Sequence, residues 1–329
     1  MTTKPKVTIN AAWHIALVKT DLEQSVEHYW NDLGIGPWQY VALSFPERAS
    51  TVYGKPALIE VDAAMAQTGF LVFGIDKPLT KPNPWEELLK TRGGGAHHLA
   101  FTVEDMDHTR TQMKSLGYRE ILSVNEAGTH RDGSTWYGEG SGSYFDTLED
   151  MGTVIELARP PSTMPGLGRV YPAADGLKRA SGINVRAAVH IGIVVKDVEK
   201  AARHYQEVFG FELGKVVTFE TPATYLGKET LFKLKAVIVK ADTFVLELVQ
   251  PLSSQNPLQD FLNRNGHGIH HFCLAVDDVH RSSEEMQRLG YSELISAYNF
   301  GPNKDGEAAY FDTEKALGIV IGLAKAPTQ

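Results

Sequence analysis

The sequence of 329 residues predicts an α+β fold built from four copies of one unit, a strand followed by a helix and three further strands. Three observations lead to this prediction. First, an eight-residue motif that begins with histidine and ends with aspartate occurs four times. Second, each copy is followed by a stretch with a helical pattern that ends in glycine. Third, each of these stretches is followed by short apolar runs. The four phrases are His14 to Asp21, His98 to Asp105, His190 to Asp197 and His271 to Asp278.

Each element of the unit has its own signal in the sequence. The residues between histidine and aspartate are rich in Val, Ile, Leu and Phe, which is typical of a buried strand. The aspartate then stands where a helix N-cap belongs, because its carboxylate can accept hydrogen bonds from free backbone amides. A glycine, at Gly34, Gly117, Gly210 and Gly290, is expected to end each helix.

The four units are of two kinds in alternation. Units one and three share a His-Tyr pair in the helix, whereas units two and four share a His-His start and a Tyr-Phe-Asp-Thr phrase near the end. This order predicts a duplicated two-unit module. We expect one module in residues 1–160, a linker rich in Pro and Gly in residues 161–185, and a second module in residues 186–329.

Composition limits the class of protein and its partners. The net charge of −8 argues against nucleic acid or an anionic membrane as a partner, and no apolar run is long enough to span a membrane. The N-terminus lacks the apolar stretch of a secretory signal. A single cysteine, Cys273, cannot form an internal disulfide, so we expect a cytoplasmic protein. The oligomeric state, including a homodimer, is left open.

The candidate ligands lie where the repeats differ. Glu156 in unit two aligns with Gly322 in unit four, and Glu247 in unit three aligns with Gly74 in unit one. A glutamate inside a buried strand is costly unless a positive group pairs with it. Together with four histidines at one position of the repeat, these carboxylates predict a site for a divalent ion, Zn, Co, Ni, Mn or Fe.

The phrases HHLAFTVEDM and HHFCLAVDDV and the ending YFDT…GTVIEL resemble the vicinal oxygen chelate superfamily, which includes glyoxalases, bleomycin resistance proteins and extradiol dioxygenases. These motifs are most similar to those of the methylmalonyl-CoA epimerase-like members of the superfamily. The resemblance implies tandem glyoxalase-like modules, in which four βαβββ units form two curved mixed sheets, with metal ligands on the first and last strands of each unit. The eight implied positions are His14, Gly74, His98, Glu156, His190, Glu247, His271 and Gly322.

Which units share a sheet decides the ligand set, and two arrangements are open. If the middle units pair, as in fused glyoxalase I enzymes, one complete metal site contains His98, Glu156, His190 and Glu247. If consecutive units pair, one site contains His14, His98 and Glu156, and the other contains His190, Glu247 and His271. We favour the middle pairing, because the loss of one whole site would explain both glycines as a single event.

The favoured site predicts the reaction. An octahedral ion with four protein ligands has two positions left, which suit two neighbouring oxygens of a small-molecule substrate. We therefore expect one divalent ion per chain and an epimerase, isomerase or lyase that moves a proton beside a carbonyl, with Glu156 or Glu247 as proton carrier. The alternatives are an Fe(II) extradiol-type dioxygenase using His14, His98 and Glu156, and a metal-free small-molecule binding protein.

Overall fold

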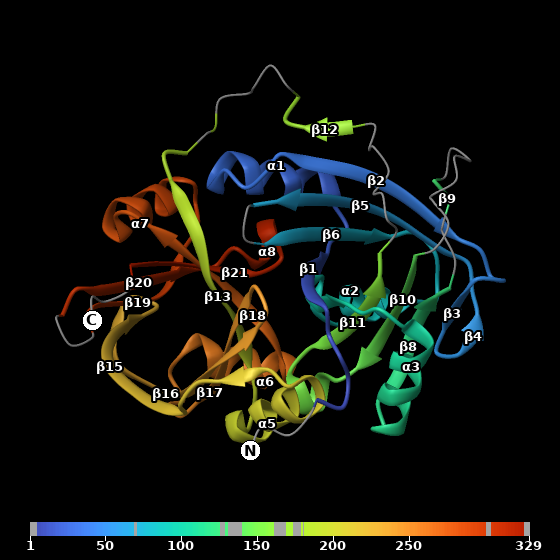
Figure 1. Cartoon of the computed structure of the whole chain (residues 1–329). Coiled ribbons are helices and arrows are strands. Elements are labelled where there is room, and N and C mark those ends of the chain that lie inside the picture. Colours follow the sequence, from blue (N-terminus) through green and yellow to red (C-terminus); the bar gives the residue numbers. More distant parts are fainter. Residues whose placement is uncertain are drawn as a thin grey trace.

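The structure is a computed structural model that describes residues 5–68, 71–125, 129–130, 140–160, 169–173, 179, 181–300 and 304–325. It has two halves, each with its own sheet, coloured blue to green and yellow to red in Figure 1. None of the helices in these ranges has the length and apolar character needed to cross a membrane. The predicted α+β fold with tandem glyoxalase-like sheets is confirmed.

The first half contains units one and two, and a short strand after them. Its elements are β1 (Ala11–Val18), α1 (Leu22–Leu33), β2 (Trp38–Phe45), β3 (Ser50–Val52), β4 (Lys55–Pro56), β5 (Ile59–Gln67), β6 (Val72–Pro78), α2 (Pro84–Arg92), β7 (Gly95–Thr102), α3 (Met106–Ser115), β8 (Arg119–Val124), β9 (Thr129–His130), β10 (Ser141–Asp146), α4 (Leu148–Met151), β11 (Val154–Arg159) and β12 (Arg169–Tyr171).

The second half contains units three and four. Its elements are β13 (Val185–Val194), α5 (Val198–Phe209), β14 (Glu212–Leu213), β15 (Val217–Tyr225), β16 (Lys228–Ala241), β17 (Phe244–Pro251), α6 (Pro257–Asn265), β18 (Gly268–Val276), α7 (Val279–Arg288), β19 (Glu293–Phe300), β20 (Gly306–Phe311), α8 (Glu314–Leu317) and β21 (Val320–Lys325).

The repeated aspartates and glycines act as the sequence predicts. The carboxylates of Asp21, Asp105, Asp197 and Asp278 each accept a hydrogen bond from the backbone N–H three residues later, at the start of α1, α3, α5 and α7. Gly34 and Gly210 end α1 and α5 in the left-handed conformation, with φ of 70° and 73°. A side chain is disfavoured in that conformation, which explains glycine at these two positions.

Strand pairing joins consecutive units. In the first sheet β1 runs antiparallel to β7 and parallel to β6, while β7 runs parallel to β11. In the second sheet β13 runs antiparallel to β18 and parallel to β17, while β18 runs parallel to β21. Units one and two therefore share one sheet, and units three and four share the other.

The two sheets differ in closure. An additional pairing between β16 and β17 closes the second sheet into a barrel of eight strands, which runs from β16 through β15, β19, β20, β21, β18 and β13 to β17. Within the described ranges the first sheet has 12 strands, and β12 pairs with β2 at its edge. Because β12 lies inside the predicted linker, part of that segment adds to the first sheet. Residues 161–168, 174–178 and 180 of the linker lie outside the described residues, and the predicted domain boundaries stay a prediction.

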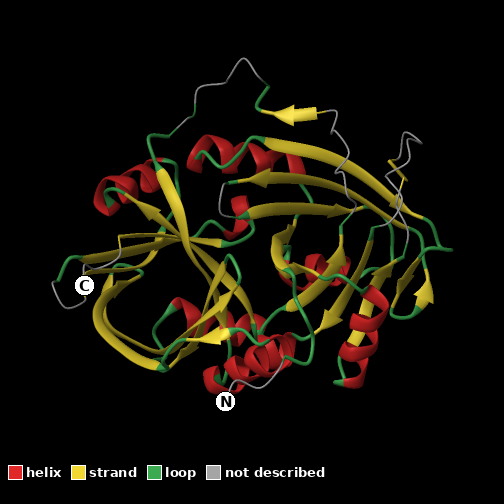
Figure 2. Ribbon diagram, in the orientation of Figure 1, coloured by secondary structure: helices red, strands yellow, loops and turns green. Residues whose placement is uncertain are grey.

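The opposite faces of each sheet have different roles. The four longer helices, α1, α3, α5 and α7, pack on the outer faces (Figure 2), and the largest core cluster lies there and includes residues of both halves. The inner faces have separate, smaller apolar clusters, which include Val18 and Val61 in the first half and Val194 and Val249 in the second. One shared core therefore holds the halves together, while each inner face remains separate.

Two tyrosines hydrogen-bond across the boundary between the halves in matching ways. Tyr29 in α1 donates to the carbonyl of Leu317 at the end of α8, at 2.9 Å, and Tyr205 in α5 donates to the carbonyl of Met151 at the end of α4, at 3.0 Å. Both phenols are fully buried. Each bond satisfies a carbonyl at a helix end that has no partner within its own helix.

We predict that Tyr205→Phe lowers the free energy of unfolding by roughly 1–2 kcal/mol, because the buried carbonyl of Met151 loses its donor. Urea denaturation followed by circular dichroism measures this change. The matched control is Tyr53→Phe, since Tyr53 is 40% exposed and its bond to Glu87 is at the surface. Equal stability of Tyr205→Phe and wild type would contradict the proposed contribution of this bond.

Candidate metal centres

The first cluster of candidate ligands lies on the inner face of the first sheet. His14 on β1, His98 on β7 and Glu156 on β11 are all buried. The Nε2 atoms of the two histidines are 3.2 Å apart, and Glu156 Oε2 is 3.3 Å from His14 Nε2 and 3.1 Å from His98 Nε2. Three potential ligand atoms therefore converge on one point.

The second cluster lies inside the barrel and consists of His190 on β13, His271 on β18 and Glu247 on β17. Nε2 of His190 is 3.1 Å from both His271 Nε2 and Glu247 Oε2, and His271 Nε2 is 3.7 Å from the same carboxylate oxygen. In this second cluster, Glu247 belongs to the same unit as His190, which is the earlier of the two histidines in the chain. In the first cluster, Glu156 belongs to the same unit as His98, which is the later of the two histidines.

These positions correct the favoured ligand set. His98 and Glu156 lie in the first sheet, whereas His190 and Glu247 lie in the second, so the four residues do not form one site. The reason is that β1 and β13 each pair with the first strand of the following unit. The expectation of one ion site per chain is also corrected, because the described residues form two His–His–Glu clusters. His14 and His271, which the middle pairing would leave outside the complete site, are members of these clusters.

The ligand spacing fits a divalent ion. An ion about 2.1 Å from three ligands at right angles holds those ligands roughly 3.0 Å apart. Glu156 Oε2 is buried and makes no hydrogen bond of ordinary geometry, although two imidazole nitrogens lie within 3.3 Å. This is the arrangement expected when all three lone pairs point to a shared ion. Burial alone would raise the pKa of Glu156, but His14 and His98 outweigh it and hold the pKa well below the usual range.

The His-His doublets of units two and four have a role that the sequence did not reveal. Nδ1 of His97 is 3.0 Å from Nδ1 of His98, and Nδ1 of His270 is 2.9 Å from Nδ1 of His271. Burial lowers the pKa of His97 and His270 well below the usual value, so both are neutral and Nδ1 of each can accept a hydrogen bond from the neighbouring Nδ1–H. Such a bond fixes the tautomer that leaves Nε2 of His98 and His271 free to bind a metal.

The fourth ligand position differs between the two clusters. A Cβ added to Gly74 would meet its nearest atoms at 3.6–3.7 Å, an ordinary contact distance, so this position has free space. A Cβ added to Gly322 would lie 2.4 Å from Cε1 of Tyr310. The tyrosine ring therefore fills the space of the missing ligand in the second cluster, whereas in the first cluster the space is open.

Two tyrosines at the same repeat position act differently for this reason. Tyr144 on β10 lies opposite Glu156, and the carboxylate acts on the phenol to raise its pKa further. Tyr310 on β20 lies opposite Gly322, and its neighbours include Cys273. Burial raises the pKa of both phenols, so both are protonated. Tyr144 can donate to the ligand carboxylate, which Tyr310 cannot do.

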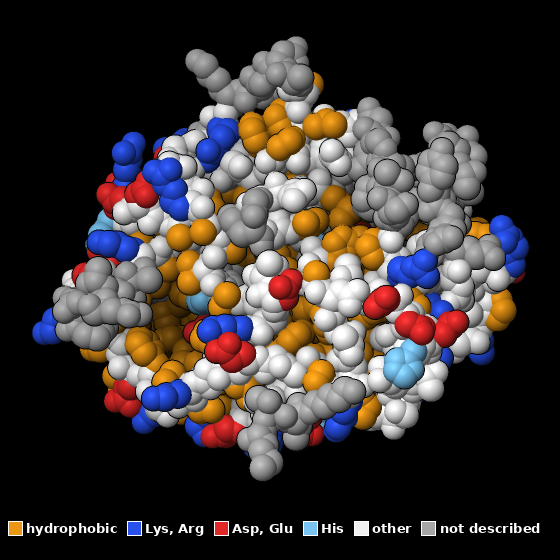
Figure 3. Space-filling model, in the orientation of Figure 1, with side chains coloured by type: hydrophobic (Ala, Val, Ile, Leu, Met, Phe, Trp, Pro, Cys, Tyr) orange, Lys and Arg blue, Asp and Glu red, His pale blue; other side chains and the backbone are white. Residues whose placement is uncertain are grey.

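Each cluster lies at the end of an apolar cavity. The first cavity has a volume of about 130 Å³ and is lined by Trp13, Trp85, Tyr144 and aliphatic side chains from β2 and β5. The second has a volume of about 300 Å³, and its lining includes Phe219, Phe232 and Phe300. Figure 3 shows a hollow lined with hydrophobic side chains in the second half.

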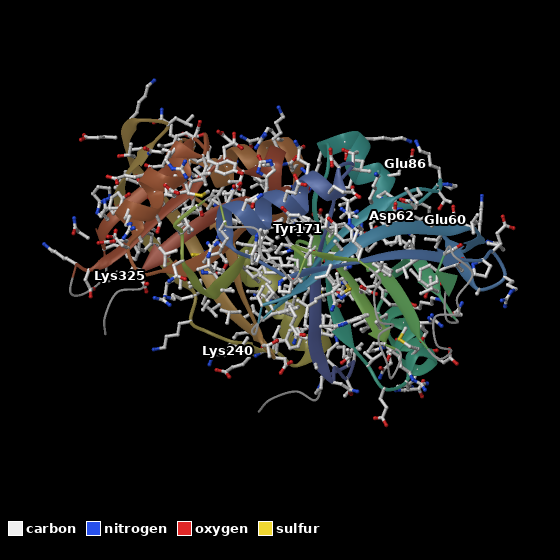
Figure 4. The ribbon with its side chains drawn as sticks, turned by 90° about the horizontal axis from the view of Figure 1, so that it is seen from above. Glu60, Asp62, Glu86, Tyr171, Lys240 and Lys325 are labelled. Carbon is white, nitrogen blue, oxygen red and sulfur yellow. The ribbon has the colours of Figure 1, made fainter. Side chains whose placement is uncertain are left out.

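Each cavity also has one cationic side chain among its described lining residues. These are Arg159 and Lys325, at equivalent ends of β11 and β21. Lys325 lies at the outer end of the second half (Figure 4).

The family model described as the Glyoxalase/Bleomycin resistance protein/Dioxygenase superfamily matches residues 13–135 and 189–311, which together are more than half of the chain. The chain therefore belongs to this superfamily. The resemblance seen in the sequence is confirmed.

Several relatives are epimerases. The chain is 30% identical over 133 residues to the mitochondrial methylmalonyl-CoA epimerase of Mus musculus. The aligned region is 40% of this chain and 68% of that protein. The chain is 27% identical over 168 residues to the Homo sapiens enzyme, covering 51% and 84% of the two chains.

Among solved structures, a mutant of 4-hydroxymandelate synthase from Streptomyces coelicolor is similar over 98% of this chain and 94% of that chain, with a TM-score of 0.58 and 12% identity. At this identity, the likeness supports the arrangement of all four units but says nothing about the reaction.

We predict that protein loaded with divalent metal and then dialysed retains two ions per chain, because each cluster supplies three converging ligands. His98→Ala and His271→Ala should each retain one ion, and the double variant none, as measured by elemental analysis. His108→Ala, which removes an exposed histidine at the start of α3, is the control and should retain two. Loss of both ions from either single variant would contradict independent sites.

The two glycines give a matched pair of variants. Gly322→Ala should lower the free energy of unfolding of the metal-free protein by roughly 1–3 kcal/mol, because its methyl group overlaps the buried ring of Tyr310. Gly74→Ala meets only ordinary contacts and should change stability by less than about 0.5 kcal/mol. Neither glycine has a positive φ, so backbone strain does not enter the comparison. Equal effects in chemical denaturation would contradict the difference between the two positions.

Proposed function

We propose that the first centre is the site of a non-haem ferrous oxygenase of the extradiol type, which cleaves a small aromatic substrate with two neighbouring hydroxyl groups. The observation that carries this proposal is the triad of His14, His98 and Glu156 with glycine at the fourth ligand position. A ferrous ion held by two histidines and one carboxylate supplies three open coordination positions, enough for a chelating substrate and dioxygen. The order His–His–Glu along the chain also resembles that of extradiol dioxygenases.

The residues around the triad suit this role. His97 and Tyr144 orient His98 and Glu156, and the absent side chain at Gly74 leaves room for a substrate oxygen. Apolar walls keep water from the reacting groups. The cavity beside the triad has a volume of about 130 Å³, which restricts the substrate to a small molecule.

A second candidate is the epimerase or isomerase reaction, which the similarity to methylmalonyl-CoA epimerases favours. A proton transfer that inverts a carbon centre requires an acid and a base on opposite faces of the substrate. Glu156, however, is held by two histidines and Tyr144, and the remaining carboxyl among the described residues of the first cavity is Asp76. A single free carboxyl favours the oxygenase.

We predict that the iron-loaded protein consumes oxygen with catechols and forms a ring-cleaved product, measured with an oxygen electrode and by absorbance. His98→Ala should reduce oxygen consumption to background because the triad is incomplete, whereas His108→Ala should retain it. In the competing assay, the protein is incubated anaerobically with carbonyl compounds in deuterated water. Deuterium beside the carbonyl, without oxygen consumption for any catechol tried, would replace the oxygenase by the isomerase.

A further inference from the structure

One acidic side chain in the first cavity has no structural explanation. Asp76 lies on β6 two residues after Gly74, so both positions face the inner side of the sheet. It lines the cavity together with His14 and Glu156. The corresponding positions in the other units, two residues after Glu156, Glu247 and Gly322, are Ala158, Val249 and Ala324. A carboxyl therefore stands at a position that is otherwise apolar.

The environment of Asp76 makes its charge costly. In the described part of the chain, its carboxyl makes no hydrogen bond and no ion pair. Burial raises the pKa of Asp76 to about 6, although His98 and His14 act in the opposite direction. Asp76 is half-buried in the cavity wall, and a carboxylate held there without a partner is less stable than one in water. Packing would be served better by alanine or valine, as in the other three units.

The other carboxyl group of this cavity is already engaged. Glu156 lies against the two histidines, and Tyr144 lies opposite it on the neighbouring strand. Arg159 is a cation and cannot accept a proton. Among the described lining residues, Asp76 is therefore the carboxyl group that no histidine holds, and it lies on the strand that carries the open ligand position at Gly74.

We propose that Asp76 is a catalytic base of the first centre, which accepts the proton of a substrate hydroxyl as that hydroxyl enters the open position beside Gly74. The O–H bond of the substrate breaks, its electron pair stays on the oxygen, and the carboxylate of Asp76 becomes a carboxylic acid. The proton returns to the product or to water when the product leaves. This inference rests on the proposed chelation of a substrate with neighbouring hydroxyl groups at the first centre.

The test uses 4-nitrocatechol, whose absorbance reports the loss of its hydroxyl protons. Metal-loaded protein is titrated without oxygen at pH 7, and all variants also carry His271→Ala so that the second centre does not contribute. Asp76→Asn should bind 4-nitrocatechol at least about tenfold more weakly, because the amide cannot accept the proton. Asp62→Asn is the matched control, since Asp62 is on the outer face of neighbouring β5 beside Glu60 (Figure 4) and should bind as the parent does.

Stability of the metal-free protein separates this role from a structural one. Folding raises the pKa of Asp76 above its unfolded value, so its contribution to stability is lost as pH rises from about 4 through about 6. Asp76→Asn avoids that loss and should have a higher Tm than the parent at pH 8. A residue needed for the fold would give a lower Tm instead.

Each outcome bears on a different claim. Equal affinity of Asp76→Asn and the parent, or a lower Tm at pH 8, overturns the role of Asp76 while the oxygenase proposal stands. Loss of the metal ion from Asp76→Asn would make Asp76 a ligand and also overturns the proposal. If the parent itself does not bind 4-nitrocatechol, the chelating function proposed for the first centre fails, and the role of Asp76 fails with it.

Discussion

Both centres depend on the antiparallel pairing between the first strands of consecutive units. Each of these strands carries one histidine on its inner face, and the register brings the two imidazoles together, at 3.2 Å between Nε2 atoms in the first half and 3.1 Å in the second. The carboxylate then comes from a strand parallel to one member of the pair. A shift of register by one residue would turn a histidine to the outer face, where the shared apolar core lies.

The sequence predicted the repeated elements well because their signals are local. An aspartate cap, an apolar strand and a glycine at the helix end act within a few residues of one another, so they hold whichever units pair. All the ligand residues of both clusters were also among the predicted positions. Their grouping could not be predicted, because the first strands of all four units have nearly the same pattern and no residue within them specifies a partner.

Other features of the sites were invisible for a related reason. The role of His97 and His270 requires knowing that their Nδ1 atoms face the neighbouring histidine. The doubled histidines of units two and four were the available signal. Asp76 stands in a phrase that reads as an ordinary strand exit, and its alignment with alanine and valine at the same repeat position could have drawn attention to it. Its lack of a partner is visible only in three dimensions.

The positions of Gly74 and Gly322 show that the two centres are not simple copies of each other. Gly74 belongs to the first unit of its half, whereas Gly322 belongs to the second unit of its half, so duplication of a module that already lacked a ligand would not produce this pattern. The two halves therefore hold two different arrangements of two histidines and one carboxylate within one polypeptide.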